Sequence, residues 1–154
     1  MRDDNDTWPE PRLFRMTGDE LQAARRAAAE RFTAIAMSYV PEGYTIEYRK
    51  SLSGRHYGAR KLIQAPRPVT RKALYIFLHE CAHAHLNHSH NGRTPRHVEE
   101  MEAEQWAHAR MREHGVPVPR AMTERAKQYV ARKIRQARRS GAKRIDPAAR
   151  RFAR

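Results

Sequence analysis

The stretch that decides the fold of this 154-residue chain is Thr70-Arg-Lys-Ala-Leu-Tyr-Ile-Phe-Leu-His-Glu-Cys-Ala-His-Ala-His85. Thr70 is suited to begin a helix, because its hydroxyl can accept a hydrogen bond from a free N–H group of the first turn. The spacing predicts a helix over residues 71–88, apolar in its first half and rich in histidine in its second. The apolar run 73–78 is far shorter than the roughly 20 residues that a membrane span needs, so we expect no membrane partner.

The histidine-rich half contains an H-E-x-x-H motif formed by His79, Glu80 and His83. Residues four apart on a helix project from one face, so both imidazoles can bind the same metal ion. Glu80 stands next to the first histidine, where it can take a proton from a water on the metal. The motif therefore predicts His79 and His83 as metal ligands and Glu80 as the catalytic base. Cys81 lies off this face, and we expect a small buried apolar residue there.

A catalytic zinc site needs a third protein ligand and an open fourth position. The helix predicted over residues 96–114 offers His97, Glu100 and Glu104 on one face. We choose Glu100 as the third ligand. We expect Glu104, one turn further on, to accept a hydrogen bond from the far nitrogen of His79 or His83 and fix its tautomer. His97 is the alternative third ligand.

These two segments together resemble the HExxH-plus-glutamate zinc metallopeptidases, called gluzincins. The second segment, Glu99-Glu-Met-Glu-Ala-Glu104, is similar to the E-E-x-x-A-E stretch in the peptidase domain of ArdC-type antirestriction proteins. It also resembles the E-x-x-A-N/D stretch of ImmA/IrrE-type peptidases. The resemblance implies a Zn²⁺ cofactor bound by His79, His83 and Glu100, with Glu80 as the base and Glu104 beside a ligand.

A rival resemblance is to the SprT-like proteases, which associate with DNA and have a histidine as third ligand. His97 lies fourteen residues after His83 and could take that part, and a basic tail suits such a protein. Against this resemblance, the glycine that follows the third histidine in that group is replaced here by Val98. We therefore favour Glu100 over His97.

The segment before the motif predicts one helix and a small β structure. A capping box, Thr17-Gly-Asp-Glu20, opens a helix that extends to about Val40, and residues 1–16 are expected to be a flexible arm. Residues 44–48 alternate like a strand, Ser53-Gly54 is a turn, and residues 55–65 are expected to return as the second strand of a hairpin or small sheet. Residues 62–65 are either an edge strand beside the expected active-site cleft, to which an extended peptide could add, or an ordinary half-buried strand.

The positive charge of the chain is concentrated near its end. Of 31 basic and 17 acidic residues, residues 116–154 hold 13 and 2, a net charge of +11, whereas residues 1–115 hold 18 and 15, a net charge of +3. We expect a helix over about 120–139 and a short helical turn near Asp146. This basic segment either binds nucleic acid non-specifically through residues 120–154, or is a solvated helix docked by Val130, Ile134 and Ala137.

The predicted fold class is α+β. With the resemblance, we expect residues 17–115 to form a small zincin-like domain and residues 116–154 to form a basic helical extension. The acidic N-terminus and the single cysteine predict a cytoplasmic protein without disulfides. The function expected is a zinc metallopeptidase acting on a protein or peptide substrate. The alternative is a nucleic-acid-binding or antirestriction-like protein of a phage or other mobile element, with a structural or vestigial zinc site.

Other polar residues near the motif are further candidates. We expect the further histidines of this region to face solvent or bind metal adventitiously: His85, His88 and His90. A group that stabilises the oxyanion is also needed, and the sequence offers four candidates without choosing among them: Tyr75, His56, Tyr57 and His108.

Overall fold

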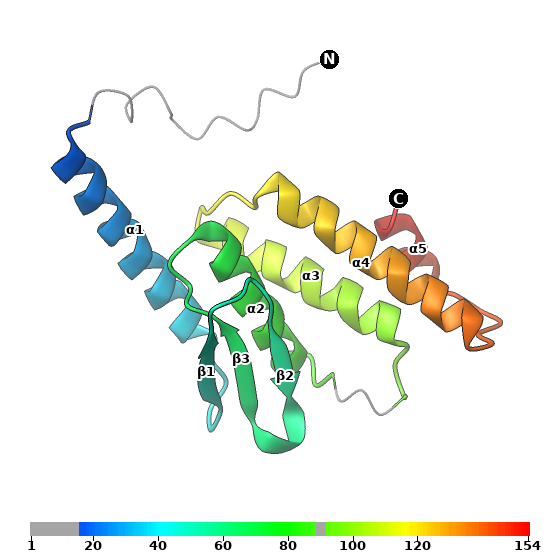
Figure 1. The fold of residues 1–154 in the computed structure, drawn as a ribbon. Coiled ribbons are helices and arrows are strands. Elements are labelled where there is room, and N and C mark those ends of the chain that lie inside the picture. The colour runs from blue at the N-terminus through cyan, green and yellow to red at the C-terminus, as the bar shows by residue number, and fades with distance from the viewer. Residues whose placement is uncertain (1–15, 89–91) are drawn as a thin grey trace, which may run out of the picture.

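The H-E-x-x-H helix, α2 (Arg71–His85), lies at the centre of the fold (Figure 1). The structure is a computed structural model that describes residues 16–88 and 92–154; the predicted arm falls outside these residues except for Met16, and His90 falls outside them entirely. Thr70 caps α2, since its Oγ1 accepts a hydrogen bond from the backbone N–H of Ala73 at 3.2 Å. The helix packs against α1 (Gly18–Ser38), α3 (Arg96–Glu113) and the sheet, and its apolar half is almost wholly buried.

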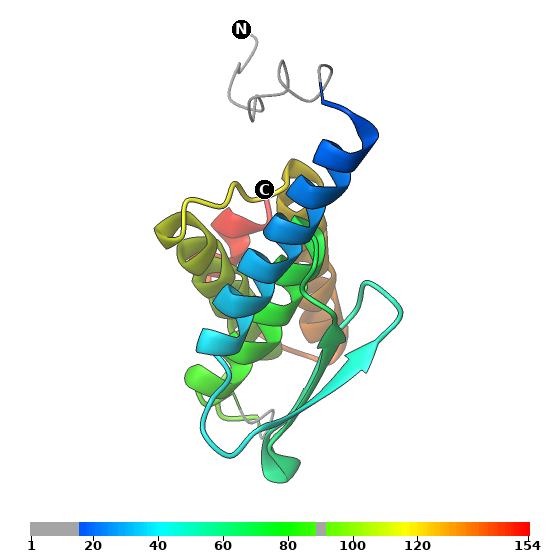
Figure 2. The same cartoon turned by 90° about the vertical axis from the view of Figure 1, so that its left-hand side faces the viewer.

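The first helix, α1 (Gly18–Ser38), begins at the predicted capping box. The backbone N–H of Thr17 donates to Glu20 Oε2 at 2.8 Å, and the N–H of Glu20 donates to Thr17 Oγ1 at 3.2 Å. Only Ile35 and Ala36, near its end, are buried, and they join the core around α2. In Figure 2 the helix lies across the front of the molecule, with the sheet to one side.

Three strands form one mixed sheet in the order β1 (Thr45–Arg49), β3 (Leu62–Pro66) and β2 (Arg55–Tyr57). β3 pairs in parallel with β1 and antiparallel with β2. The small sheet expected from residues 44–48 and 55–65 is therefore present, but the two segments do not pair as a simple hairpin, because β1 and β3 run parallel. The 3₁₀ turn η2 (Gly58–Arg60) and the left-handed Lys61 (φ 46°) divide the second segment into two strands.

The central strand of this sheet is β3, so the edge-strand alternative for residues 62–65 is wrong. Its backbone is paired on both sides, so no further strand can add to it. The physical reason is burial: four of its five residues are buried, and a strand so apolar is most stable between two others and beneath α2. The edge strand that borders the candidate site is instead β2.

The three remaining helices are α3 (Arg96–Glu113), α4 (Arg120–Arg139) and α5 (Pro147–Phe152). α3 contacts α2 and α4, and α3 and α4 run side by side in Figure 1. A second apolar cluster joins α3 to the basic segment, formed by Met101, Val130, Ile134, Ile145 and Ala149. The basic helix is thus docked, which was one of the two alternatives for this segment, and the predicted helical turn near Asp146 is present as α5, capped by that residue.

The described part of the chain therefore forms an α+β domain with five helices and three strands, and the predicted fold class is confirmed. None of the helices within residues 16–88 and 92–154 combines the length and the apolar character needed to cross a membrane.

Candidate metal centre

The fold brings His79 and His83 of α2 against Glu100 of α3. The Nε2 atoms of the two histidines are 3.1 Å apart. Glu100 Oε2 lies 3.3 Å from Nε2 of His79 and 3.7 Å from Nε2 of His83. Three ligand atoms from two helices thus face one point, and these are the three residues expected as ligands. The group is a candidate metal site.

The geometry of this triangle fits a tetrahedral ion. An ion about 2.0–2.1 Å from its ligands places neighbouring ligand atoms about 3.3–3.4 Å apart, close to the three distances observed. Glu100 is only 1% exposed, and its Oε2 accepts no hydrogen bond within the part of the chain that the structure describes. A buried carboxylate oxygen without a donor is unfavourable. A divalent cation between Glu100 and the histidines would satisfy it.

Electrostatics keep two of the three groups in the form that binds metal. Burial lowers the pKa of His83 to about 3, so its imidazole is neutral. Burial by itself would raise the pKa of Glu100, but His79 and His83 outweigh it and hold that pKa well below its ordinary value. Arg96, one turn earlier on α3, pairs with the other oxygen of Glu100 at 2.7 Å and leaves Oε2 turned towards the histidines.

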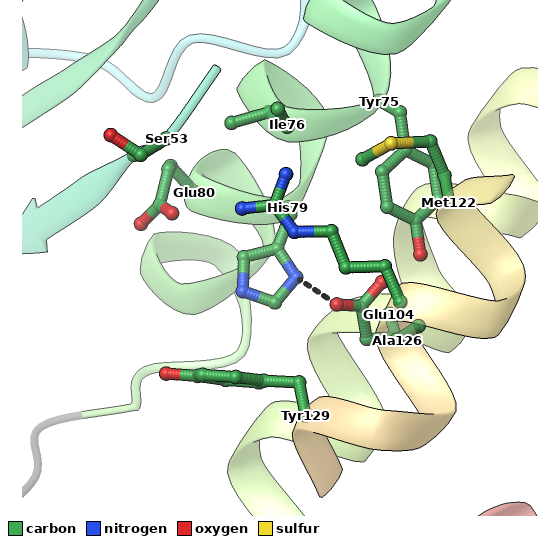
Figure 3. A pocket seen from close by; sticks show the side chains of 11 residues that line it. Ser53, Tyr75, Ile76, His79, Glu80, Glu104, Met122, Ala126 and Tyr129 are labelled. Atoms are coloured by element: carbon green, nitrogen blue, oxygen red, sulfur yellow. Dashed lines mark ion pairs between the residues drawn. The ribbon is translucent and has the colours of Figure 1, made fainter. Parts of the chain in front are cut away.

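Each histidine has a partner at its far nitrogen. Glu104 Oε1 lies 3.3 Å from Nδ1 of His79, the ion pair drawn in Figure 3. Glu104 is one turn beyond Glu100 on α3 and is 6% exposed. The placement is the one expected for Glu104. Burial raises its pKa to about 8, and in its ionised form Glu104 favours the tautomer of His79 with hydrogen on Nδ1, which leaves Nε2 free.

The partner of His83 is His88, which the sequence prediction missed. The Nδ1 atoms of the two rings are 3.0 Å apart, and Nε2 of His88 lies 3.0 Å from Glu102 Oε2. When Nε2 of His83 is left free for a metal, its Nδ1–H donates to Nδ1 of His88, and the Nε2–H of His88 donates to Glu102. The expectation that His88 faces solvent is therefore wrong, because this residue is 5% exposed.

The early end of α2 explains why His88 was missed. The helix stops at His85, three residues before its predicted end, and Asn87 adopts a left-handed conformation (φ 55°). The backbone N–H of His88 then donates to the carbonyl oxygen of His83 at 2.9 Å, which folds the chain back onto that ring. On a continued helix, residue 88 would point away from the face of His83. His85, by contrast, is exposed, as expected.

The candidate base, Glu80, is held by the loop that precedes β2. A Cβ added to Gly54 would lie 2.5 Å from both Cγ and Oε1 of Glu80, so a larger residue here would force this carboxylate to shift. Burial raises the pKa of Glu80 to about 7, despite the opposing effect of His79. A carboxylate with that pKa is well matched to accept a proton near neutral pH. The sequence had indicated only a turn at Gly54.

His79 and Glu80 line a cleft. It consists of two adjoining hollows that share Gly54, His79, Glu80 and Tyr129. Figure 3 shows Tyr129 of α4 reaching towards His79 of α2. The basic segment therefore supplies one wall of the cleft, a placement that its charge pattern did not indicate.

The four oxyanion candidates lie at different depths around this cleft. Tyr75 lines one hollow, and its hydroxyl is 3.1 Å from Nε2 of His108, which itself lines neither hollow. His56 and Tyr57 line the other, and the ring of His56 stacks near that of His83 with 6.1 Å between centroids. Cys81 is fully buried, as expected.

The alternative third ligand, His97, is not brought to this site. It is 2% exposed, and its Nε2 accepts a hydrogen bond from the backbone N–H of Asp146 at 3.3 Å. The side chain thus contacts the start of α5 and is not part of the cluster with His79 and His83.

Metal content distinguishes the two possible third ligands. We expect wild-type protein, purified without a metal-binding tag, to contain about one divalent ion per chain by elemental mass spectrometry. Glu100→Gln should remove it, because the buried amide offers no charge to the cation. His97→Gln should retain it. Loss of the ion in the His97 variant alone would contradict the assignment of Glu100.

The contact with His88 predicts a second effect on metal binding. His88→Phe keeps the ring but removes the acceptor for Nδ1–H of His83, so we expect metal affinity to fall about 10–100-fold. Titration against a chelator of known affinity measures this change. His85→Phe is the matched control, since that histidine lies outside the cluster, and its affinity should equal that of the wild type. Equal affinities in all three proteins would exclude a role for His88.

The close approach of Gly54 predicts that a single methyl group displaces Glu80. We expect Gly54→Ala to bind metal like the wild type but to lose about 10–100-fold in kcat for any hydrolysis that Glu80 supports, because misplacing a proton acceptor has effects of this size. Gly18→Ala is the control, as no atom lies within 4 Å of a Cβ added there. An unchanged kcat in Gly54→Ala would show that the position of the Glu80 carboxylate does not depend on a glycine at residue 54.

Comparison with known proteins returns no match, either to a family model, to a curated protein or to a solved structure. The resemblance to gluzincins thus rests on the motif residues alone. The function of the chain has to be inferred from what the fold assembles around His79 and His83.

Proposed function

We propose that this protein is a zinc-dependent metallopeptidase. The observation that carries the proposal is the buried triangle of His79, His83 and Glu100, with Glu80 beside it in an open cleft. Two imidazoles and one carboxylate are the ligand set of catalytic zinc sites such as those with an H-E-x-x-H motif. Within the described residues the cluster has only three members, so a fourth position is available to water or substrate.

Each residue of the site has a definite task in peptide hydrolysis. Zn²⁺, when bound, supplies Lewis-acid catalysis. Glu80 accepts the proton of the attacking water and later returns it to the nitrogen of the leaving amine. Glu104 and His88 orient the two imidazoles through their far nitrogens. Of the four oxyanion candidates, Tyr75, His56 and Tyr57 line the cleft.

An alternative function also has one observation in its favour. The +11 charge of residues 116–154 suits a nucleic-acid-binding protein in which zinc is structural or vestigial. A purely structural site gives no reason for Glu80 to be kept beside the ligands under a glycine, or for a cleft to reach them. The proposal of a peptidase therefore explains more of the buried polar residues than the proposal of a nucleic-acid-binding protein does.

The role of Glu80 separates these two functions. We expect Glu80→Gln to retain one zinc ion per chain and to lose at least about 100-fold in peptide hydrolysis, because the amide cannot accept the proton. Release of amines from denatured proteins measures the hydrolysis. Glu30→Gln, on the exposed face of α1, is the control for the same chemical change. If Glu80→Gln still hydrolyses peptides, Glu80 is not the base. If the zinc-loaded wild type hydrolyses no peptide, the protein is not a peptidase.

A further inference from the structure

A row of side chains on α4 forms a hollow of its own beside the cleft. Its lining residues recur at helical spacing, three or four apart, and we call them together the arginine hollow: Arg125, Gln128, Tyr129, Arg132 and Arg135. The hollow has a volume of about 390 Å³ and contains no acidic residue in its lining. Three positive charges therefore share one recess on this helix.

The arginine hollow continues into the cleft of the metal centre. Arg125 and Tyr129 line both the hollow and the part of the cleft that contains His79 and Glu80. Tyr129 also lines the second part of the cleft, beside Glu100. A chain bound across the metal centre can therefore extend over Tyr129 directly onto the arginines.

The guanidinium groups of the hollow are available to a ligand. Arg132 and Arg135 are exposed, and no carboxylate within the described residues lies within ion-pair distance of them. Among the described residues, Arg125 donates a hydrogen bond to the backbone carbonyl of Leu52 at 3.2 Å, and its charge also acts on Glu104 in the cleft. Arg132 packs over the ring of Tyr129 at 4.8 Å, which restrains its position at the border with the cleft. Unpaired arginines held in a recess favour a carboxylate or phosphate ligand, which they bind in bidentate geometry.

We propose that the arginine hollow binds acidic side chains of the substrate, so that the enzyme selects peptides with aspartate or glutamate on one side of the scissile bond. This inference rests on the proposed peptidase function. A peptide can place its carboxylates in the hollow alone and present neutral backbone to the metal centre. A nucleic-acid duplex carries one charge per about 1.7 Å along its whole length, whereas the cations that line the hollow are three guanidinium groups within one recess. The observations therefore favour an acidic peptide over nucleic acid.

The test uses two unstructured peptides that differ only in Glu or Gln at the same positions. We expect the zinc-loaded wild type to cleave the Glu peptide with a kcat/KM about tenfold higher, because the unpaired arginines add charge-assisted hydrogen bonds. The double variant R132E/R135E should reverse the preference. R138E/R139E is the matched control, since it makes the same charge change on exposed residues of α4 outside the hollow, and it should behave like the wild type.

A binding experiment keeps this inference distinct from the peptidase function. Fluorescence anisotropy of the labelled peptides on Glu80→Gln protein should show about tenfold tighter binding of the Glu peptide, lost when R132E/R135E is added. Equal binding of the two peptides would overturn the inference even if both are cleaved. Tighter binding of random-sequence DNA than of the Glu peptide, lost in R132E/R135E but not in R138E/R139E, would identify a nucleic-acid site and also overturn it. If the Glu peptide binds selectively but neither peptide is cleaved, the proposed peptidase function is wrong and the arginine hollow is still a site for acidic peptides.

Discussion

Three glutamates buried on one helix are the constraint on which the rest of this structure depends. Glu99, Glu100 and Glu104 of α3 are at most 6% exposed, and carboxylates are rarely buried unless they are paired. His79 of α2 pairs with both Glu100 and Glu104. Arg96, on α3 itself, also pairs with Glu100. Because these contacts lie between α2 and α3, the candidate metal centre is also part of the interface that holds the two helices together. A bound cation would stabilise the fold as well as supply the chemistry.

The basic segment completes this arrangement from the other side. Val130 and Ile134 of α4 join the second apolar cluster against α3, and this packing turns Arg125 and Tyr129 towards the cleft. One helix thus covers α3 and forms a wall of the site. The positive charge of the basic segment divides into two groups. Some arginines of α4 border the cleft, and further cations along the remainder of α4 and α5 face solvent.

The precision of the site comes from residues that bind nothing themselves. Gly54 leaves room for Glu80, while His88 and Glu104 occupy the far nitrogens of the two histidines. Fixed tautomers and a confined carboxylate mean that little reorganisation is needed when a ligand binds. None of these three residues belongs to the H-E-x-x-H motif, and two of them come from chain segments outside α2 and the glutamate helix.

The sequence by itself determined the features that depend on neighbours within one helix. Capping by Thr17 and Thr70, the helical periods, and the common face of His79 and His83 are local, as is the spacing from Glu100 to Glu104. Only the tertiary structure decided the order of the strands, the return of His88 to His83, and the approach of Gly54 and Tyr129 to the motif. These contacts join residues through turns and packing between separate elements. Their geometry depends on left-handed residues such as Lys61 and Asn87 and on how two apolar faces meet, which no periodic pattern along the chain encodes.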